Sequence, residues 1–197
     1  AFGNAAVRGV RSWDLRDNQV PQVLCANTAQ RPTVITITVG ANDLFLGDPD
    51  LVGIAKRVAQ GVDLLLHNDG ILSPVLGATP VVDPHSKRRC RALSDATVMV
   101  SNYYSLPHPV PSIFQLLDVA ERVYDQSLRF WLQHIAVPPG SRIVVVDLYT
   151  PSLGQQGLVT IQRRLGATAP FDFDFHPTNL GHAFIAEQFK KAWNNLP

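Results

Sequence analysis

The chain has 197 residues, of which 46% are hydrophobic and 17% are charged, and its formal net charge is +1. This length favours a single domain over residues 1–197, and the composition excludes collagen-like, disordered and low-complexity chains. A charge so close to zero argues against nucleic acid as a partner. No apolar run approaches the roughly 18 residues that span a membrane, so we predict a globular protein without a transmembrane segment.

The first half of the chain predicts a helix, a strand and a second helix. The first helix covers residues 12–28, with Pro21 as a point where it can kink. The strand covers residues 33–39, which are all β-branched and lead into Gly40; this composition is typical of a strand buried on both faces. Apolar residues at helical spacing predict the next helix over residues 49–66.

The second half continues this alternation after an irregular stretch. Residues 67–95 are rich in breakers, and we interpret them as an inserted loop or short hairpin near the mouth of the site. Strands are predicted at 96–101 and 142–147, and helices at 113–135 and 178–194. Strands that alternate with helices predict a parallel sheet covered on both sides, whose ligands bind beyond the carboxyl ends of the strands.

One such strand end carries the sequence Gly40-Ala41-Asn42-Asp43. The side chain of Asn42 offers two N–H donors, which can hydrogen-bond an oxygen that gains charge during acyl transfer. Asp43 can cap the turn that follows it. The alternative is an Asx-type turn without a chemical role, which is the commoner use of these residues.

A second motif lies just before the last predicted helix and contains Asp172, Asp174 and His176. In an extended segment these alternate positions share one face. A carboxylate there can fix the tautomer of His176 and leave its other ring nitrogen to accept a proton. Pro177 suits the first position of a helix, which predicts His176 at the helix start. The alternative is a set of residues that only cap the helix.

Together these motifs resemble those of the SGNH, or GDSL-type, esterase and lipase family. A third element, Asn4-Ala5-Ala6-Val7-Arg8-Gly9, precedes the first helix. The resemblance implies that Gly9 gives its backbone N–H and Asn42 its side chain to an oxyanion hole, and that His176 is the general base. It also implies a flavodoxin-like, three-layer α/β/α fold with a five-stranded parallel sheet.

The acid of the catalytic set departs from the family pattern. The family's usual acid lies three residues before the histidine, where this chain has Phe173. We therefore expect Asp174 to orient His176, with Asp172 as the alternative. The implied chemistry is hydrolysis of small-molecule or lipid esters by two-step acyl transfer, which needs no metal or organic cofactor.

The nucleophile block of the family, Gly-Asp-Ser at the end of a central first strand, does not occur in the chain. Without that strand its two neighbours would expose unpaired backbone groups, each costing about 1–3 kcal/mol. Total stabilities are only about 5–15 kcal/mol. We therefore expect the chain to be N-terminally incomplete, with the serine on an upstream segment or on a separate N-terminal fragment.

Two other functions stay open at this point. A chain without the serine could be a non-catalytic SGNH-like protein that binds an ester, a glycan or a protein partner. Alternatively, carboxylates and histidines could form a metal-dependent hydrolase. The residues for that metal site would be Asp83, His85, Asp172, Asp174 and His176.

The two cysteines, Cys25 and Cys90, can form one disulfide or stay free, and the sequence does not decide between these states. Two thiols are too few for a zinc site made of cysteine alone. The sequence also leaves the localisation open. Because many members of the resembling family are exported, the resemblance favours secretion.

Overall fold

The computed structural model describes residues 10–26, 32–40, 42–43, 48–103, 111–163 and 173–196. For residues 111–118, 160–163 and 173–176 it describes the backbone alone. The chain divides into two compact units. The first contains Ala1–Asn102 and Arg122–Val145, and the second contains Tyr103–Glu121 and Val146–Pro197. A single domain over the whole chain remains a prediction.

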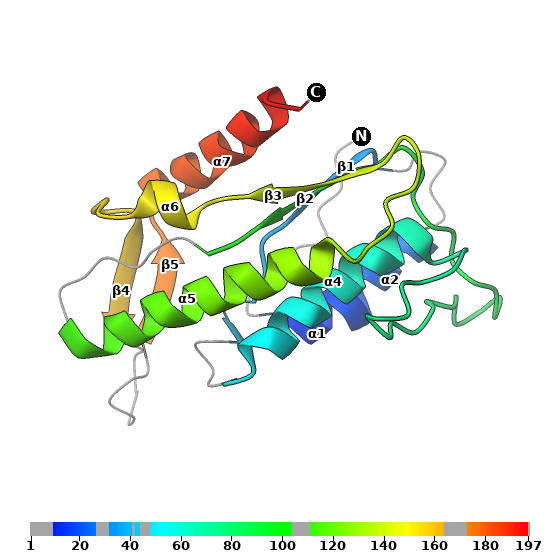
Figure 1. Cartoon of the computed structure of the whole chain (residues 1–197), viewed down its shortest axis with the longest axis horizontal. Helices are drawn as coiled ribbons and strands as arrows, with labels where there is room; N and C mark the ends of the chain where they lie inside the picture. The colour runs from blue at the N-terminus through cyan, green and yellow to red at the C-terminus, as the bar shows by residue number, and fades with distance from the viewer. Residues whose placement is uncertain are drawn as a thin grey trace. The chain divides into compact units, whose positions relative to one another are not determined.

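The first unit is built on a three-stranded parallel sheet (Figure 1). Its strands are β1 (Val34–Ile37), β2 (Thr97–Ser101) and β3 (Arg142–Val146), and they lie in this order. Val34 stands opposite Thr97, and Ile37 stands opposite Val100. All five residues of β2 are buried, as expected for a central strand covered on both faces.

The prediction of burial on both faces was wrong for β1. Val34 is 42% exposed and Thr36 is also exposed, whereas Ile37 is buried. The physical reason is position: among the described strands, β1 pairs with β2 on one side only. A further strand beside β1, as the resemblance implies, is compatible with this open edge.

A helix with an irregular middle opens the described chain. It consists of α1 (Ser12–Asp14), a π-helical segment η1 (Leu15–Gln19) and α2 (Val20–Cys25). The π-helical segment ends immediately before α2, which has Pro21 in its first turn. Because proline has no backbone N–H, the irregularity lies where the sequence predicts a kink. The helix ends at Cys25, three residues before its predicted end.

The helix α4 (Leu51–His67) packs along α1, η1 and α2 (Figure 1). Its first turn is capped by Asp50, whose carboxylate accepts a hydrogen bond of 2.8 Å from the Gly53 N–H. The apolar face predicted from the spacing is buried, with Ile54, Val58 and Val62 fully inaccessible. This face therefore anchors the first unit around α4.

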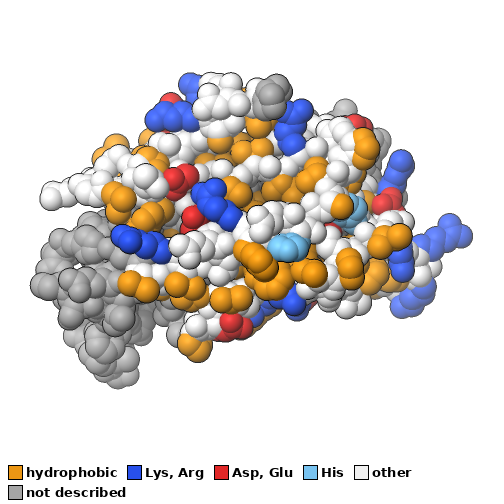
Figure 2. All heavy atoms as spheres, in the orientation of Figure 1, with side chains coloured by type: hydrophobic (Ala, Val, Ile, Leu, Met, Phe, Trp, Pro, Cys, Tyr) orange, Lys and Arg blue, Asp and Glu red, His pale blue; other side chains and the backbone are white. Residues whose placement is uncertain are grey.

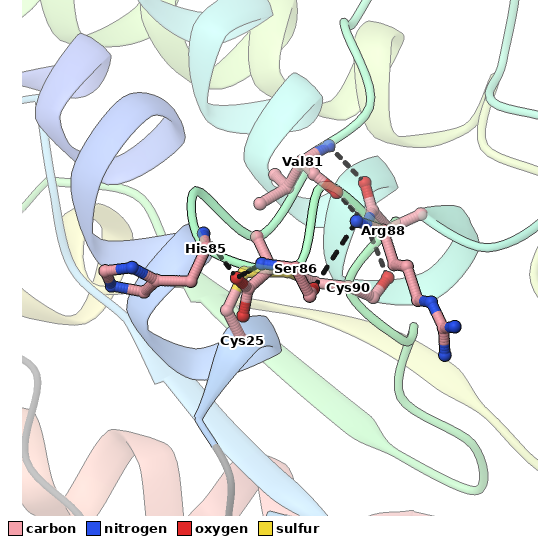
Figure 3. The surroundings of a disulfide bond; sticks show 8 residues. Cys25, Val81, His85, Ser86, Arg88 and Cys90 are labelled. Carbon is pink, nitrogen blue, oxygen red and sulfur yellow. Dashed lines mark hydrogen bonds between the residues drawn. A yellow bond between two sulfur atoms is a disulfide. The ribbon is translucent and has the colours of Figure 1, made fainter.

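The segment of residues 68–95, which we call the loop, follows α4. It contains no helix or longer strand, and one isolated antiparallel bridge pairs Val82 with Arg89. Cys90 forms a disulfide with Cys25 at the end of α2 (Figure 3). The irregular structure agrees with the breaker-rich sequence, and the pairing of the two cysteines is resolved. That the loop is an insertion near the site remains a prediction.

The helix α5 (Pro111–Leu132) has residues in both units. Its later part belongs to the first unit, where Tyr124 and Leu128 are fully buried. The Tyr124 hydroxyl donates a hydrogen bond to the Val39 oxygen, 3.3 Å away. This bond fixes α5 to the chain that leaves β1, directly before Gly40.

The second unit contains α6 (Tyr149–Ser152), β4 (Val159–Arg163), β5 (Phe173–Pro177) and α7 (Asn179–Asn194). The strands β4 and β5 form a separate antiparallel pair, in which Thr160 stands opposite His176. Sequence reasoning did not find β4. It also placed Pro177 at the first position of a helix, which was wrong, because Pro177 ends β5 and Thr178 is the N-cap of α7.

Candidate active site

The turn after β1 places Asn42 against the chain that follows Gly9. Gly40 has a φ of 108°, a conformation that L side chains rarely adopt, so the turn requires glycine. The Asn42 Nδ2 donates a hydrogen bond to the Val10 oxygen at 2.9 Å. Two segments 32 residues apart therefore meet here. Gly9 itself lies outside the described residues, and its role remains a prediction.

The neighbouring Asp43 is fully buried and binds the start of α1. Its carboxylate accepts hydrogen bonds from the Ser12 N–H at 2.8 Å and from the Ser12 hydroxyl at 2.7 Å. We predicted that Asp43 would cap the turn that follows it. Its described side-chain bonds instead go to the first residue of α1, which is 31 positions earlier. Asp43 thereby satisfies a free N–H at a helix start.

A guanidinium from α4 balances this buried carboxylate. The Arg57 Nε donates a hydrogen bond of 2.7 Å to the Ser12 hydroxyl, and its Nη2 lies 3.5 Å from Asp43 Oδ1. The same Nη2 also binds Asp48 at 2.7 Å. A buried carboxylate is stable only when it is paired. Arg57 therefore connects the start of α1, the turn after β1 and the chain before α4.

Sequence reasoning missed Arg57 and Ser12, because no local pattern links residues so far apart. The structure also defines what Ser12 does. Ser12 is fully buried, and its hydroxyl both donates to Asp43 and accepts from Arg57. This hydroxyl is therefore a structural group and not a nucleophile in this arrangement.

The second motif lies on β5 and at the start of α7. Asp174 stands opposite Gln162, and His176 stands opposite Thr160. Positions two apart share one side of a strand, so the extended geometry that we predicted holds for Asp174 and His176. Asp172 lies outside the described residues.

The junction between β5 and α7 is fixed by Thr178. Its hydroxyl accepts a hydrogen bond from the Gly181 N–H at 3.1 Å and donates one to the Gly157 oxygen at 2.5 Å. The Thr178 N–H binds the Leu158 oxygen at 2.9 Å. The residue after Pro177 is thus anchored on both its backbone and its side chain, directly next to the strand that carries His176.

The predicted site residues fall into both units. Asn42 belongs to the first unit, whereas Asp174 and His176 belong to the second. Each half is ordered by the contacts described above. That the two halves meet in one site is a prediction.

The described residues give the metal-site alternative no support. No group of three or more His, Cys, Asp or Glu side chains in this part of the chain could hold a metal ion. Asp83 instead accepts hydrogen bonds of 2.8 Å from the N–H groups of His85 and Ser86. These backbone bonds, first that from Ser86 and then that from His85, hold the pKa of the Asp83 carboxyl below its ordinary value.

Comparisons with known proteins agree with the fold and the motifs. A family model described as GDSL-like lipase/acylhydrolase matches residues 2–189. The crystal structure of a carbohydrate esterase family 3 from Talaromyces cellulolyticus is similar, with a TM-score of 0.51 and 15% sequence identity. The alignment covers 93% of this chain and 66% of that structure, so the chain spans just under two thirds of its length. No curated protein gives a match.

The structural likeness confirms the predicted α/β fold class and, at this identity, the fold alone. Among the helices that the structure describes, none is long and apolar enough to cross a membrane.

Proposed function

Because the chain belongs to the GDSL-like lipase/acylhydrolase family, we propose that it is part of a serine ester hydrolase of the SGNH type. Its substrates are small-molecule or lipid esters. The observation that carries this proposal is the hydrogen bond from Asn42 to Val10. It brings the amide of one expected oxyanion donor to the residue next to the other expected donor, Gly9.

The Asn42 amide has a second N–H besides the one that Val10 accepts. In the proposed mechanism this N–H and the Gly9 N–H bind the oxygen that becomes negative when the ester carbonyl is attacked. Such donors stabilise the transition state because they are already oriented before charge develops. The buried bonds of Asp43 and Arg57 support this orientation, since they hold Asp43, directly after Asn42, against Ser12, which lies two residues after Val10.

His176 and Asp174 carry the proton transfers. His176 takes the proton from the serine hydroxyl as the oxygen attacks the ester carbon, and an acyl-enzyme forms. It then gives that proton to the leaving alcohol. In the second step His176 activates a water molecule, which releases the acid and restores the serine. Asp174 orients His176 and stabilises its charged form.

The nucleophilic serine comes, in this proposal, from a segment upstream of residues 1–197. The chain has no Gly-Asp-Ser sequence, and the Ser12 hydroxyl is buried between Asp43 and Arg57. In the described part of the structure β1 pairs on one side only. A strand added there parallel to β1 would bring its carboxyl end to the same edge as Gly40 and Asn42.

The test is to label the purified natural protein with a fluorophosphonate and to map the modified residue by mass spectrometry. Hydrolysis of p-nitrophenyl acetate and the intact mass under denaturing conditions are measured in parallel. We expect hydrolysis, and a label on a Gly-Asp-Ser serine outside these residues. A label on a serine within residues 1–197 would contradict the proposed origin of the nucleophile.

A protein that neither hydrolyses esters nor takes the label would contradict the enzymatic proposal altogether. In that case the non-catalytic binding function would replace it. A His176→Ala variant serves as the control, because it should lose both labelling and hydrolysis while a serine remains present.

A further inference from the structure

The loop of residues 68–95 is held to the first unit as a preformed structure. The Cys25–Cys90 disulfide fixes one end of its hairpin (Figure 3). Asn68, which is fully buried, donates hydrogen bonds to the oxygens of Val81 and Cys90 at 2.9 and 2.5 Å. Its carbonyl oxygen accepts one from the Val81 N–H at 2.6 Å. The base of the hairpin is therefore fixed, and its tip projects from a rigid support.

Positive charge is concentrated on this hairpin. Between Val81 and Arg91 the chain has four Lys or Arg residues and one carboxylate, Asp83, whereas the whole chain has a net charge of only +1. The cations are Lys87, Arg88, Arg89 and Arg91, and all four are exposed. The Asp83 carboxylate already accepts hydrogen bonds from the backbone N–H groups of His85 and Ser86.

The cations at the tip are exposed. Within the described part of the chain, none of Lys87, Arg88 and Arg89 forms an ion pair, and the Arg88 side chain extends away from the disulfide (Figure 3). In Figure 2, some of the Lys and Arg side chains lie on the side of the first unit where Figure 1 draws the loop. Lys87, Arg88 and Arg89 are therefore available to an external anion.

Exposed apolar side chains accompany this charge. Ile71 is 90% exposed, and Val75 and Val82 are also exposed. Val82 is the bridge partner of Arg89, so an apolar and a cationic residue stand side by side on the hairpin. Ile71 lies three residues after Asn68, which contacts the hairpin base directly.

We propose that the loop docks the protein on an anionic lipid surface. Lys87, Arg88 and Arg89 contact the charged headgroups, while Ile71 and Val82 enter the boundary between headgroups and acyl chains. Cations gain free energy near an anionic membrane, and apolar groups gain more when they leave water. A soluble polyanion, such as a nucleic acid or a sulfated polysaccharide, would use the cations but would leave Ile71 in water. This proposal does not depend on the proposed ester hydrolysis.

The test is cosedimentation of the whole chain with vesicles of phosphatidylcholine alone and of an equimolar mixture with phosphatidylserine. We expect binding to the mixed vesicles only, and a binding constant that falls as salt rises. The double variant Arg88→Gln, Arg89→Gln should bind about thirty-fold more weakly. The matched control is Lys190→Gln, Lys191→Gln, which removes the same charge from exposed positions of α7 and should bind nearly as the wild type does.

A third variant distinguishes binding to a lipid surface from binding to a soluble polyanion. Ile71→Ser should weaken vesicle binding roughly tenfold without changing its salt dependence, because it removes only apolar contact. Thermal unfolding checks that each variant is folded. Absence of binding by the wild type, or an equal loss in both double variants, overturns the proposal. Retention on a heparin column without vesicle binding also overturns it and assigns the cations to a soluble polyanion.

Discussion

The Asn42 side chain donates its hydrogen bond to the backbone oxygen of Val10, and Asp43, the next residue, binds Ser12, two residues further along. The two segments therefore contact each other at two points, through two successive residues of the turn. Such a double contact determines the position of Asn42 more closely than a single bond would. The effect of replacing Asn42 on stability can therefore be measured separately from its effect on activity.

Replacing Asn42 by alanine tests its role as an oxyanion donor. In the protein that carries the serine, we expect kcat for p-nitrophenyl acetate to fall about 10²–10³-fold, the usual loss for one such donor. The lost bond to Val10 should lower the free energy of unfolding by only about 1 kcal/mol. Asn18→Ala is the control, because Asn18 is exposed and binds only Asp14 among the described residues. An unchanged kcat would argue against the role.

The two carboxylates that bind Arg57 should differ in their contribution to stability. Asp43→Ala leaves the Ser12 N–H and the Arg57 guanidinium without their buried partner, so we expect a loss of about 3 kcal/mol. Asp48 is partly exposed, and Asp48→Ala should cost only about 1 kcal/mol. Urea denaturation measures both values. Equal losses would show that the buried Asp43 contributes no more to stability than the partly exposed Asp48.

The disulfide should contribute measurably to stability, because it closes a segment of 65 residues. In the variant Cys25→Ser, Cys90→Ser we expect the free energy of unfolding to fall by about 2–4 kcal/mol. A reductant should lower the melting temperature of the wild type and leave that of the variant unchanged. If the reductant affects both proteins alike, or neither, the bond is not formed in solution.

Gly181 should be intolerant of substitution. A Cβ atom at this position would collide with the Leu158 carbonyl oxygen, which is backbone and cannot move aside. We therefore expect Gly181→Ala to destabilise the protein by about 1–3 kcal/mol, as overpacking usually does. Gly70→Ala is the matched control, since its Cβ would meet only ordinary contact distances. A neutral Gly181→Ala would mean that the junction before α7 is looser than described.

The turn at the hairpin tip should weaken in acid. The pKa of Asp83 is lowered because its ionised form accepts hydrogen bonds from the backbone of Ser86 and His85. A group with a lowered folded-state pKa stabilises the structure above its unfolded pKa, and this contribution disappears as the pH falls through the folded value. We expect an NMR titration of the Asp83 carboxyl to show a midpoint below the ordinary 3.8. A midpoint at or above that value would contradict the capping bonds.

Elements with a strong local pattern were predictable from the sequence. The spacing of apolar residues in α4 and the β-branched run in β3 both identify elements that the structure contains. The exposure of β1 was not predictable in this way, because it depends on which strands lie beside it. The strand β4 was missed, although Gly157 followed by an apolar, β-branched run could have indicated it.

The candidate site was predictable only in its residue types. The Gly-x-Asn-Asp and His-Pro sequences make Asn42 and His176 candidates, because their chemistry is visible in a short motif, and their roles stay predictions. The partners that fix them were not visible. Arg57 is one of several charged residues on an amphipathic helix, and only the fold brings it to Ser12 and Asp43.

Asn68 performs for the hairpin what a neighbouring strand performs in a sheet. The Asn68 side chain hydrogen-bonds to the backbone N–H and the backbone oxygen of Val81, and also to the backbone oxygen of Cys90. The hairpin base therefore needs no strand beside it, and the tip between Asp83 and Arg88 is independent of the core. A foreign peptide grafted at this tip should be displayed on an unchanged support, since exposed loop tips tolerate insertion best.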